Sequence, residues 1–327
     1  MLPAVELSRR DRVAGALLGL HAGDALGSAV EFSSWAEIRS RYPDGVRDIV
    51  GGGPFAWPPG HATDDTDLTR AVLLAYLSPG DDVVRTAADT MVAWLTGDWP
   101  GRVPGSSPRD VGRATAAGLR RYQQGGDPGR SGCGPGQAGN GSLMRCMPTA
   151  LVVADRDRRI RESVALSAIT HDDPRCTGAC AAYNEICAAL VGGATPEEAI
   201  DEGLRTATGL DCAAVAGSIG YGRHLKPAML AVTGQTFLDD DAAGFVLDSL
   251  SLAVAAVLDR RPFAEVLVHI VRVGNDTDSN GAIAGGLLGA RDGAGAIPTE
   301  WVSVLQFADE FTAAAGKLAG ERDGGTR

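Results

Sequence analysis

The chain has 327 residues and a formal net charge of −11, with 44% hydrophobic and 22% charged residues. This balance is typical of a globular protein with a sizeable core, arranged as one large domain or two ordinary ones. The acidic excess argues against nucleic-acid backbones and anionic membrane surfaces as partners, because both attract clustered Lys and Arg. We find no apolar run long enough to span a bilayer and no signal-peptide layout, and therefore expect a cytoplasmic protein.

Apolar residues repeat with helical spacing throughout the chain. The spacing predicts helices in residues 13–20, 68–76, 84–95, 111–122, 176–190, 246–257 and 263–271. Ser8 and Asp11 resemble a capping box ahead of the first helix. The Gly- and Pro-rich segments between these stripes are expected to be loops, mainly residues 51–60, 97–108 and 125–141. We therefore predict an all-α, compact multi-helix fold in a single domain, residues 1–327, with a frayed tail at 321–327.

The six cysteines are too few for a disulfide scaffold in a chain of this length. Cys176, Cys180 and Cys187 share one face of a predicted helix. We expect them to be buried packing residues, because a structural zinc site favours shorter ligand spacings and a matching second pair.

Two acidic clusters stand directly before predicted helices, in residues 63–67 (TDDTD) and 274–280 (GNDTDSN). Carboxylates at a helix N-terminus are stabilised by free N–H groups and the helix dipole, and this role alone explains either cluster. Together they hold more carboxylates than capping needs, and crowded carboxylates repel unless a cation neutralises them. Oxygen ligands without His or Cys favour Mg²⁺ or Mn²⁺ over Zn²⁺, and two clusters can share two ions.

Two further segments place small residues beside polar ones. In residues 139–145 (GNGSLMR), glycines let the backbone approach a ligand, and a following helix would present N–H groups to an anion. An ordinary glycine-rich turn is the alternative. Asp24 and Glu31 are seven residues apart and would face the same way on a continuous helix. Here the alternative is a solvated helix end.

The order of these motifs resembles that of the ADP-ribosylglycohydrolase family over nearly the whole chain. The similar segments are residues 15–32 (GALLGLHAGDALGSAVEF), 63–66 (TDDT), 110–112 (DVG), 139–148 (GNGSLMRCMP), 170–171 (TH), 244–250 (GFVLDSL) and 274–290 (GNDTDSNGAIAGGLLGA). Each motif alone is moderately specific, whereas the ordered set is highly specific. Ser279 stands where many members have Thr and keeps the hydroxyl, and Asn275 stands where many have Gly.

The resemblance implies an all-helical fold with two Mg²⁺ or Mn²⁺ ions at the base of a cleft. By motif position, the expected metal ligands are Thr63, Asp64, Asp65, Asp276, Asp278 and Ser279. The expected substrate-binding residues are Gly112, Asn140, Gly141, Ser142 and His171. Glu31 and Asp110 are the expected catalytic residues, either of which could move the proton.

The activity implied by the resemblance is hydrolysis of the C1 bond between ADP-ribose and an acceptor. Cleavage builds positive charge on the ribose, which nearby carboxylates can stabilise. An arginine-linked ADP-ribosyl protein is the first expectation for the substrate. Serine-linked ADP-ribose, O-acetyl-ADP-ribose, nucleic-acid bases and small molecules stay open as alternatives. We expect the loops at residues 97–108 and 125–138 to select the acceptor.

Two other classes of function also stay open. His171 and Asp172 form the dipeptide of the HD-type phosphohydrolases, although that chemistry needs further His ligands and the chain has five His in all. The second alternative is a catalytically silent relative that binds ADP-ribose or serves a structural role. We expect a monomer.

Overall fold

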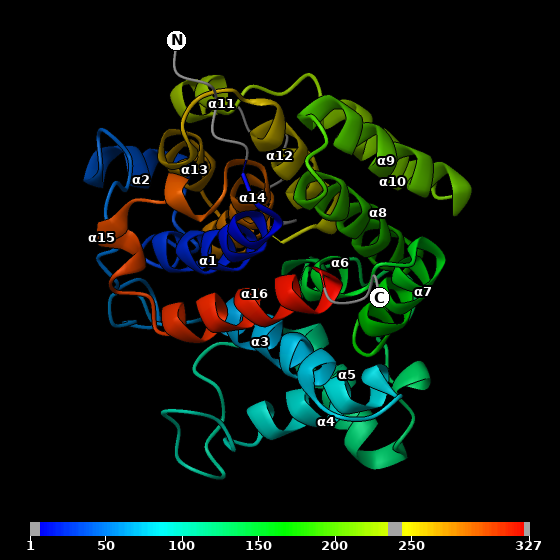
Figure 1. The fold of residues 1–327 in the computed structure, drawn as a ribbon. Helices are drawn as coiled ribbons and strands as arrows, with labels where there is room; N and C mark the ends of the chain where they lie inside the picture. Colours follow the sequence, from blue (N-terminus) through cyan, green and yellow to red (C-terminus); the bar gives the residue numbers. More distant parts are fainter. Residues whose placement is uncertain (1–6, 235–243, 324–327) are drawn as a thin grey trace.

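A computed structural model describes residues 7–234 and 244–323, with the side chains of 321–323 left out. This described part consists of helices and the loops between them, without a β-sheet; its only β-type pairings are two isolated bridges, Gly52 with Trp57 and Gly139 with Phe245 (Figure 1). The all-α prediction is confirmed. None of the described helices is both long and apolar enough to cross a membrane.

Two helices from opposite ends of the sequence form the centre of the molecule, α1 (Arg9–Gly27) and α14 (Thr277–Asp292), which lie side by side (Figure 1). Ser8 caps α1, as predicted, by accepting a hydrogen bond from the backbone N–H of Asp11. The two backbones touch along a glycine stripe. A Cβ atom on Gly23 would overlap the carbonyl oxygen of Gly281 on α14. Small residues therefore fix the N-terminus of α14 beside the C-terminus of α1.

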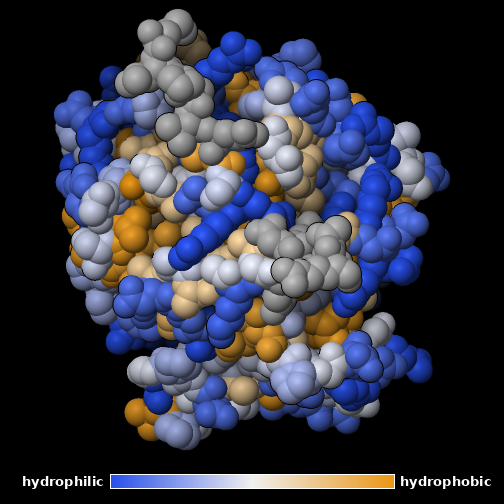
Figure 2. All heavy atoms as spheres, in the orientation of Figure 1, coloured by the Kyte–Doolittle hydropathy of each residue, from blue (hydrophilic) through white to orange (hydrophobic). Residues whose placement is uncertain are grey.

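The remaining long helices surround this pair. They are α3 (Asp64–Leu77), α4 (Val83–Leu95), α5 (Arg113–Gly125), α7 (Arg156–Ala168), α8 (Pro174–Val191), α9 (Pro196–Gly209), α10 (Ala213–Gly222), α12 (Val246–Leu258), α13 (Phe263–Val271) and α16 (Ala308–Asp323). Shorter helices are α2 (Trp35–Arg41), α6 (Pro148–Val152), α11 (Pro227–Thr233) and α15 (Thr299–Val302). Helix α16 lies along α1, and α8 and α12 pack on α14 (Figure 1). The face drawn in Figure 2 is mainly hydrophilic, with apolar patches between the charged residues.

The predicted helical stripes are confirmed, with helices at each of the expected places. Cys176, Cys180 and Cys187 are fully buried on α8 and form no disulfide, in agreement with a packing role. Helix α16 ends at Asp323, and residues 324–327 of the expected tail lie outside the described residues.

Candidate active site

Each acidic cluster forms the first turn of its helix rather than a loop before it. Helix α3 begins at Asp64, four residues earlier than its apolar stripe suggested, because the Thr63 hydroxyl caps it by accepting from the N–H of Asp65. Helix α14 begins at Thr277, whose hydroxyl donates to the carbonyl of Gly27 at 2.8 Å. That bond ties the start of α14 to the end of α1. The helix starts therefore direct both clusters at one place.

Carboxylates that are far apart in the sequence converge there. Oxygen atoms of Asp24, Asp65 and Asp278 lie within 4.8 Å of one another, and so do oxygens of Glu31, Asp110 and Asp278. Asp278 belongs to both groups and joins them into one centre. Among the described residues, these groups of possible metal ligands contain no His and no Cys.

Asp24 is the member of this centre that sequence reasoning missed as a functional residue. Its Oδ2 atom accepts hydrogen bonds from the N–H groups of Thr63 and Thr66, at 3.1 and 3.3 Å, and from the Thr66 hydroxyl. Its Oδ1 atom is buried without a hydrogen-bond partner in the described structure. The Oδ2 atom of Asp24 thus stabilises the first turn of α3. Asp24 also lies close to the other carboxylates of the centre. The Gly-Asp-Ala-Leu-Gly motif was the only sequence signal for it.

Glu31 reaches the centre by a different route from the one expected. Helix α1 ends at Gly27, so Glu31 does not lie on a continuous helix with Asp24. The chain turns after Ser28, and Phe32 adopts a left-handed φ of 60° while its N–H donates to the carbonyl of Asn275 at 2.8 Å. Asn275 has a φ of 64°, a region that Asn tolerates better than most residues and that Gly adopts freely. Because position 275 has this left-handed φ, it suits both the Asn of this chain and the Gly that many family members have there.

Burial and mutual repulsion make the centre unfavourable for negative charge. Desolvation, followed by the Coulombic effect of neighbouring carboxylates, raises the pKa of Asp64, Asp65 and Asp278 well above the usual value. The same two causes, in the same order, raise the pKa of Glu31 to about 9 and that of Asp110 to about 6. A cation would reverse these effects, since an opposite charge favours the ionised carboxylate.

The carboxylate oxygens of the centre that lack hydrogen-bond partners fit a hard divalent cation. Within the described part of the chain, the Oδ1 atoms of Asp24, Asp65 and Asp278 and the Oε2 atom of Glu31 are buried without hydrogen-bond partners. Buried polar atoms are nearly always paired, so these four oxygens could serve as ligands of a cation. Oxygen-only donor sets suit Mg²⁺ and Mn²⁺.

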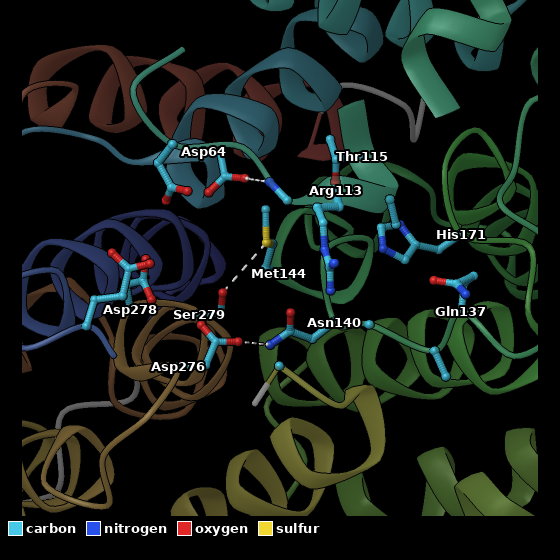
Figure 3. Close-up of a pocket in the computed structure, with 18 of the residues that line it drawn as sticks. Asp64, Arg113, Thr115, Gln137, Asn140, Met144, His171, Asp276, Asp278 and Ser279 are labelled. Carbon is cyan, nitrogen blue, oxygen red and sulfur yellow. Dashed lines mark hydrogen bonds between the residues drawn. The ribbon is translucent and has the colours of Figure 1, made fainter. Parts of the chain in front are cut away.

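A cavity of about 320 Å³ opens above the carboxylates (Figure 3). Ten of the thirteen residues expected to act in the site line it: Glu31, Asp64, Asp110, Gly112, Asn140, Gly141, His171, Asp276, Asp278 and Ser279. The other three lie behind its wall. Asp65 is fully buried beneath the cavity, Thr63 caps α3, and the Ser142 hydroxyl is bonded to that of Ser167 at 2.9 Å.

The wall opposite the carboxylates carries the glycine-rich segment and His171 (Figure 3). The Asn140 side chain donates to Asp276 at 2.7 Å and to the Ser249 hydroxyl at 3.0 Å. The segment is followed not directly by an α-helix, as expected, but by a 3-10 turn, Leu143–Arg145, and then by the short helix α6. No anion site on a helix N-terminus is therefore formed here. Gly141 is needed for space, because a Cβ there would lie 2.9 Å from Cε1 of His171.

Three lining residues with polar side chains lie outside the motifs singled out in the sequence, namely Arg113, Thr115 and Gln137, whereas Phe32 and Met144 belong to two of those motifs but were not selected as site residues. Their contribution depends on how the loops fold over the cavity. Arg113 begins α5 and brings an exposed guanidinium to the cavity, where the rest of the charge is negative (Figure 3).

A second cavity of about 250 Å³ adjoins the first, and Asp64 and Asp110 line both. Its other walls come from Trp57, His61, Thr63, Asp67, Trp94 and the loop at residues 101–109, so the predicted ligand Thr63 lines this second cavity. The Trp57 ring stacks on His61, with centroids 5.0 Å apart, and the Arg109 guanidinium lies 5.5 Å from the Trp57 ring centroid. The two cavities thus meet at a pair of carboxylates.

The arrangement does not suit HD-type chemistry. His171 lies on the wall across the cavity from the carboxylates, and Asp172 is exposed, accepting a hydrogen bond from the N–H of Gly134 (Figure 3). No His from the described residues joins the metal-binding groups.

Comparison with known proteins agrees with this geometry. The family model described as ADP-ribosylglycohydrolase matches residues 6–326, and the chain belongs to that family. It is 31% identical over 304 residues to the ADP-ribosyl-[dinitrogen reductase] glycohydrolase of Rhodospirillum rubrum, covering 92% of both chains. It is 29% identical to the ADP-ribosylarginine hydrolase Tri1 of Pseudomonas putida, over 94% of this chain and 78% of the relative.

A solved structure supports the same conclusion. A chain of an ADP-ribosylglycohydrolase-related protein complex superposes with a TM-score of 0.78 and 29% identity, over 96% of this chain and 98% of that one. The fold, the order of the motifs and these relatives together make the protein an ADP-ribosyl hydrolase, an enzyme that acts on glycosyl bonds. The catalytically silent alternative is therefore dropped.

Proposed function

We propose that the enzyme removes ADP-ribose from arginine side chains of modified proteins, by hydrolysis of the bond at C1 of the distal ribose. The observation that carries this proposal is the pair of cavities that meet at Asp64 and Asp110. A bond cleaved at that junction has ADP-ribose on one side and the acceptor on the other. The larger cavity suits the ADP-ribosyl group, and the smaller one suits a side chain.

The proposed cofactor is a pair of Mg²⁺ or Mn²⁺ ions. The residues proposed to hold them are Thr63, Asp64, Asp65, Asp276, Asp278 and Ser279, with Asp24 facing the same centre. When bound, such ions supply positive charge that orients the ribose and lowers the pKa of water near the anomeric carbon. The unpaired oxygens of Asp65 and Asp278 support this assignment.

Asp110 is our choice for the residue that moves the proton. It lines both cavities, so it borders the place where the cleaved bond would lie, and it is less buried than Glu31. Glu31 lines only the first cavity, and its pKa of about 9 in the cation-free centre keeps it protonated. We assign to Glu31 the stabilisation of positive charge on the ribose once a cation has restored its ionisation.

The preference for arginine rests on the chemistry of the junction. The carboxylates of Asp64 and Asp110 complement a guanidinium, which is planar, permanently charged and able to donate several hydrogen bonds. The Trp57 ring offers an aromatic face of the kind on which guanidinium groups stack, and Arg109 occupies such a position in the structure.

The test is a panel of defined conjugates incubated with Mg²⁺ or Mn²⁺, with free ADP-ribose as the readout. The panel contains arginine-linked and serine-linked ADP-ribosyl peptides, O-acetyl-ADP-ribose and an ADP-ribosylated nucleic acid. We expect the arginine-linked peptide to be cleaved with the highest kcat/KM. Faster cleavage of another conjugate would overturn the acceptor assignment and leave the hydrolase assignment in place.

A further inference from the structure

Arg145 is a buried cation beneath the wall of the larger cavity. Arg145 is 1% exposed, and none of the ion pairs in the described part of the chain includes it. One Nη atom donates to the carbonyl of Gly141, and the other donates to the Thr170 hydroxyl at 2.7 Å. Burial lowers the pKa of Arg145 to about 10, so the guanidinium stays charged at neutral pH.

The donors and acceptors around Thr170 fix the hydrogen-bond direction. A guanidinium can only donate, so the Thr170 oxygen accepts from Arg145 and its own proton needs an acceptor. Thr170 is fully buried, and the remaining partner of its hydroxyl among the described residues is Nδ1 of His171, at 2.7 Å. If Nδ1 carried a proton, the hydroxyl proton of Thr170 would be buried without an acceptor. The favoured arrangement therefore leaves Nδ1 unprotonated.

His171 then presents an N–H group to the cavity. A neutral imidazole with an unprotonated Nδ1 carries its proton on Nε2. Nε2 has no hydrogen-bond partner among the described residues, and it lies next to the space left by Gly141, where a Cβ would be 3.3 Å away. The ring is neutral because burial, and then the nearby charge of Arg145, lower its pKa to about 3.

We propose that Arg145 and Thr170 are positioning residues, which hold a neutral His171 with its Nε2–H directed at an anionic oxygen of the bound pyrophosphate group. The proposal rests on the proposed function, because ADP-ribose supplies that pyrophosphate. His171 is thus a fixed hydrogen-bond donor and not a proton acceptor in the reaction.

This arrangement addresses an electrostatic difficulty. The protein carries a net charge of −11, and one side of the cavity is lined with carboxylates, so long-range attraction does not help an anionic substrate. A buried guanidinium without an ion pair supplies positive potential from inside the wall, and in low dielectric its effect on a nearby phosphate is strong. The Nε2–H group of His171, on the cavity surface, adds a directed hydrogen bond to this attraction.

The test uses the whole enzyme with Mg²⁺ bound and compares Thr170→Val, which removes the hydroxyl, with Thr170→Ser, which keeps it. Nitrogen-15 NMR of the His171 ring reports which nitrogen carries the proton, with His171→Gln to assign the signals. Calorimetric titration with ADP-ribose measures binding. Thr206→Val is the matched control, because Thr206 is also buried and its hydroxyl also accepts from an arginine, Arg156, at 3.1 Å.

We expect the parent and Thr170→Ser rings to be neutral at pH 7 with the proton on Nε2. Thr170→Val should lose this pattern and bind ADP-ribose about tenfold or more weakly, the effect of one hydrogen bond to a charged group, with KM raised more than kcat is lowered. Thr206→Val should change neither. A parent ring protonated on Nδ1, or unchanged binding in Thr170→Val, would overturn the proposal. If the tautomers and the binding are as expected but no conjugate is hydrolysed, the positioning roles of Arg145 and Thr170 would be supported and the proposed function would be refuted.

Discussion

The two walls of the larger cavity differ in whether their buried polar groups have hydrogen-bond partners within the protein. On the carboxylate wall, oxygens of Asp24, Asp65 and Asp278 are buried and unpaired, and their ionisation is disfavoured. On the opposite wall, Asn140, Thr170 and Arg145 already have hydrogen-bond partners within the protein. The first wall needs a cation to reach its working state, whereas the second is preorganised. Catalysis and stability should therefore depend on metal at one wall only.

The largest expected effect is that of Asp278→Asn, because Asp278 joins both groups of converging carboxylates. We expect kcat/KM in Mg²⁺ to fall about 10³-fold or more, since metal-ion catalysis is worth several kcal/mol. The same variant should unfold at a higher temperature than the parent when both are chelated at high pH, because Asn, unlike the buried and crowded Asp278 carboxyl, cannot ionise. Asp157→Asn is the control, an exposed carboxylate in the first turn of α7. Parental turnover in Asp278→Asn would contradict the account.

Without metal, the repulsion among the buried carboxylates should make the stability of the enzyme depend on pH. A carboxyl whose pKa is raised on folding binds its proton more tightly in the folded state, so the stability it contributes is present at low pH and is lost as pH rises. The loss begins near pH 4, where these carboxyls ionise in the unfolded chain, and ends near pH 9, because the folded-state pKa values of Asp110, Asp24 and Glu31 are about 6, 7 and 9. Thermal unfolding of the chelated enzyme should show Tm falling across that range.

Mg²⁺ at a hundred times its dissociation constant should restore about 3 kcal/mol, or roughly 5 °C in Tm, at pH 8. The effect of Mg²⁺ should shrink towards pH 5, where the carboxyls are protonated. A chelated enzyme that is more stable at pH 9 than at pH 6 would show that the carboxylate wall is not strained.

Gly23→Ala tests whether the contact between α1 and α14 supports the carboxylate wall. The new methyl group would overlap the carbonyl of Gly281, and overpacking of this kind costs about 1–3 kcal/mol. Because Gly23 adjoins Asp24, the concentration of Mg²⁺ needed for half-maximal activity should also rise. Gly217→Ala on α10 is the matched control, since nothing lies within 4 Å of the added Cβ there. It should stabilise the protein by about 0.5–1 kcal/mol in denaturant unfolding.

The smallest expected effects come from the preorganised wall. Asn140→Ala should raise KM about tenfold, more than it lowers kcat, and should also weaken Mg²⁺ activation, because Asn140 donates to Asp276. Ser142→Ala should change KM about twofold or less, since its hydroxyl bonds Ser167 behind the wall. Steady-state kinetics at several Mg²⁺ concentrations separates the two. A larger loss of kcat than of binding in Asn140→Ala would assign that residue to the chemical step.

Sequence reasoning predicted the features that depend on local pattern. Apolar periodicity indicated the helices, and two carboxylate clusters with flanking hydroxyls indicated an oxygen-rich metal site. The ordered motifs indicated the family. Asp64, Asp276 and Asp278 could be selected because their residue types and crowding carry the signal.

Features that depend on long-range packing could not be predicted. The link from Asp24 to Thr66 joins residues 42 apart and depends on how α1 packs beside the first turn of α3. Arg145 looks like a surface cation in the sequence, and only its burial gives it a role. The second cavity depends on how the loop at residues 101–109 folds over Trp57.

Counting bound Mn²⁺ by electron paramagnetic resonance tests the proposed pair of metal ions without any substrate. We predict that the chelated parent enzyme takes up two Mn²⁺ ions whose spectra show magnetic coupling, and that Asp278→Asn takes up fewer and shows no coupling. Absence of binding in the parent, or identical binding in Asp278→Asn, would contradict this proposal.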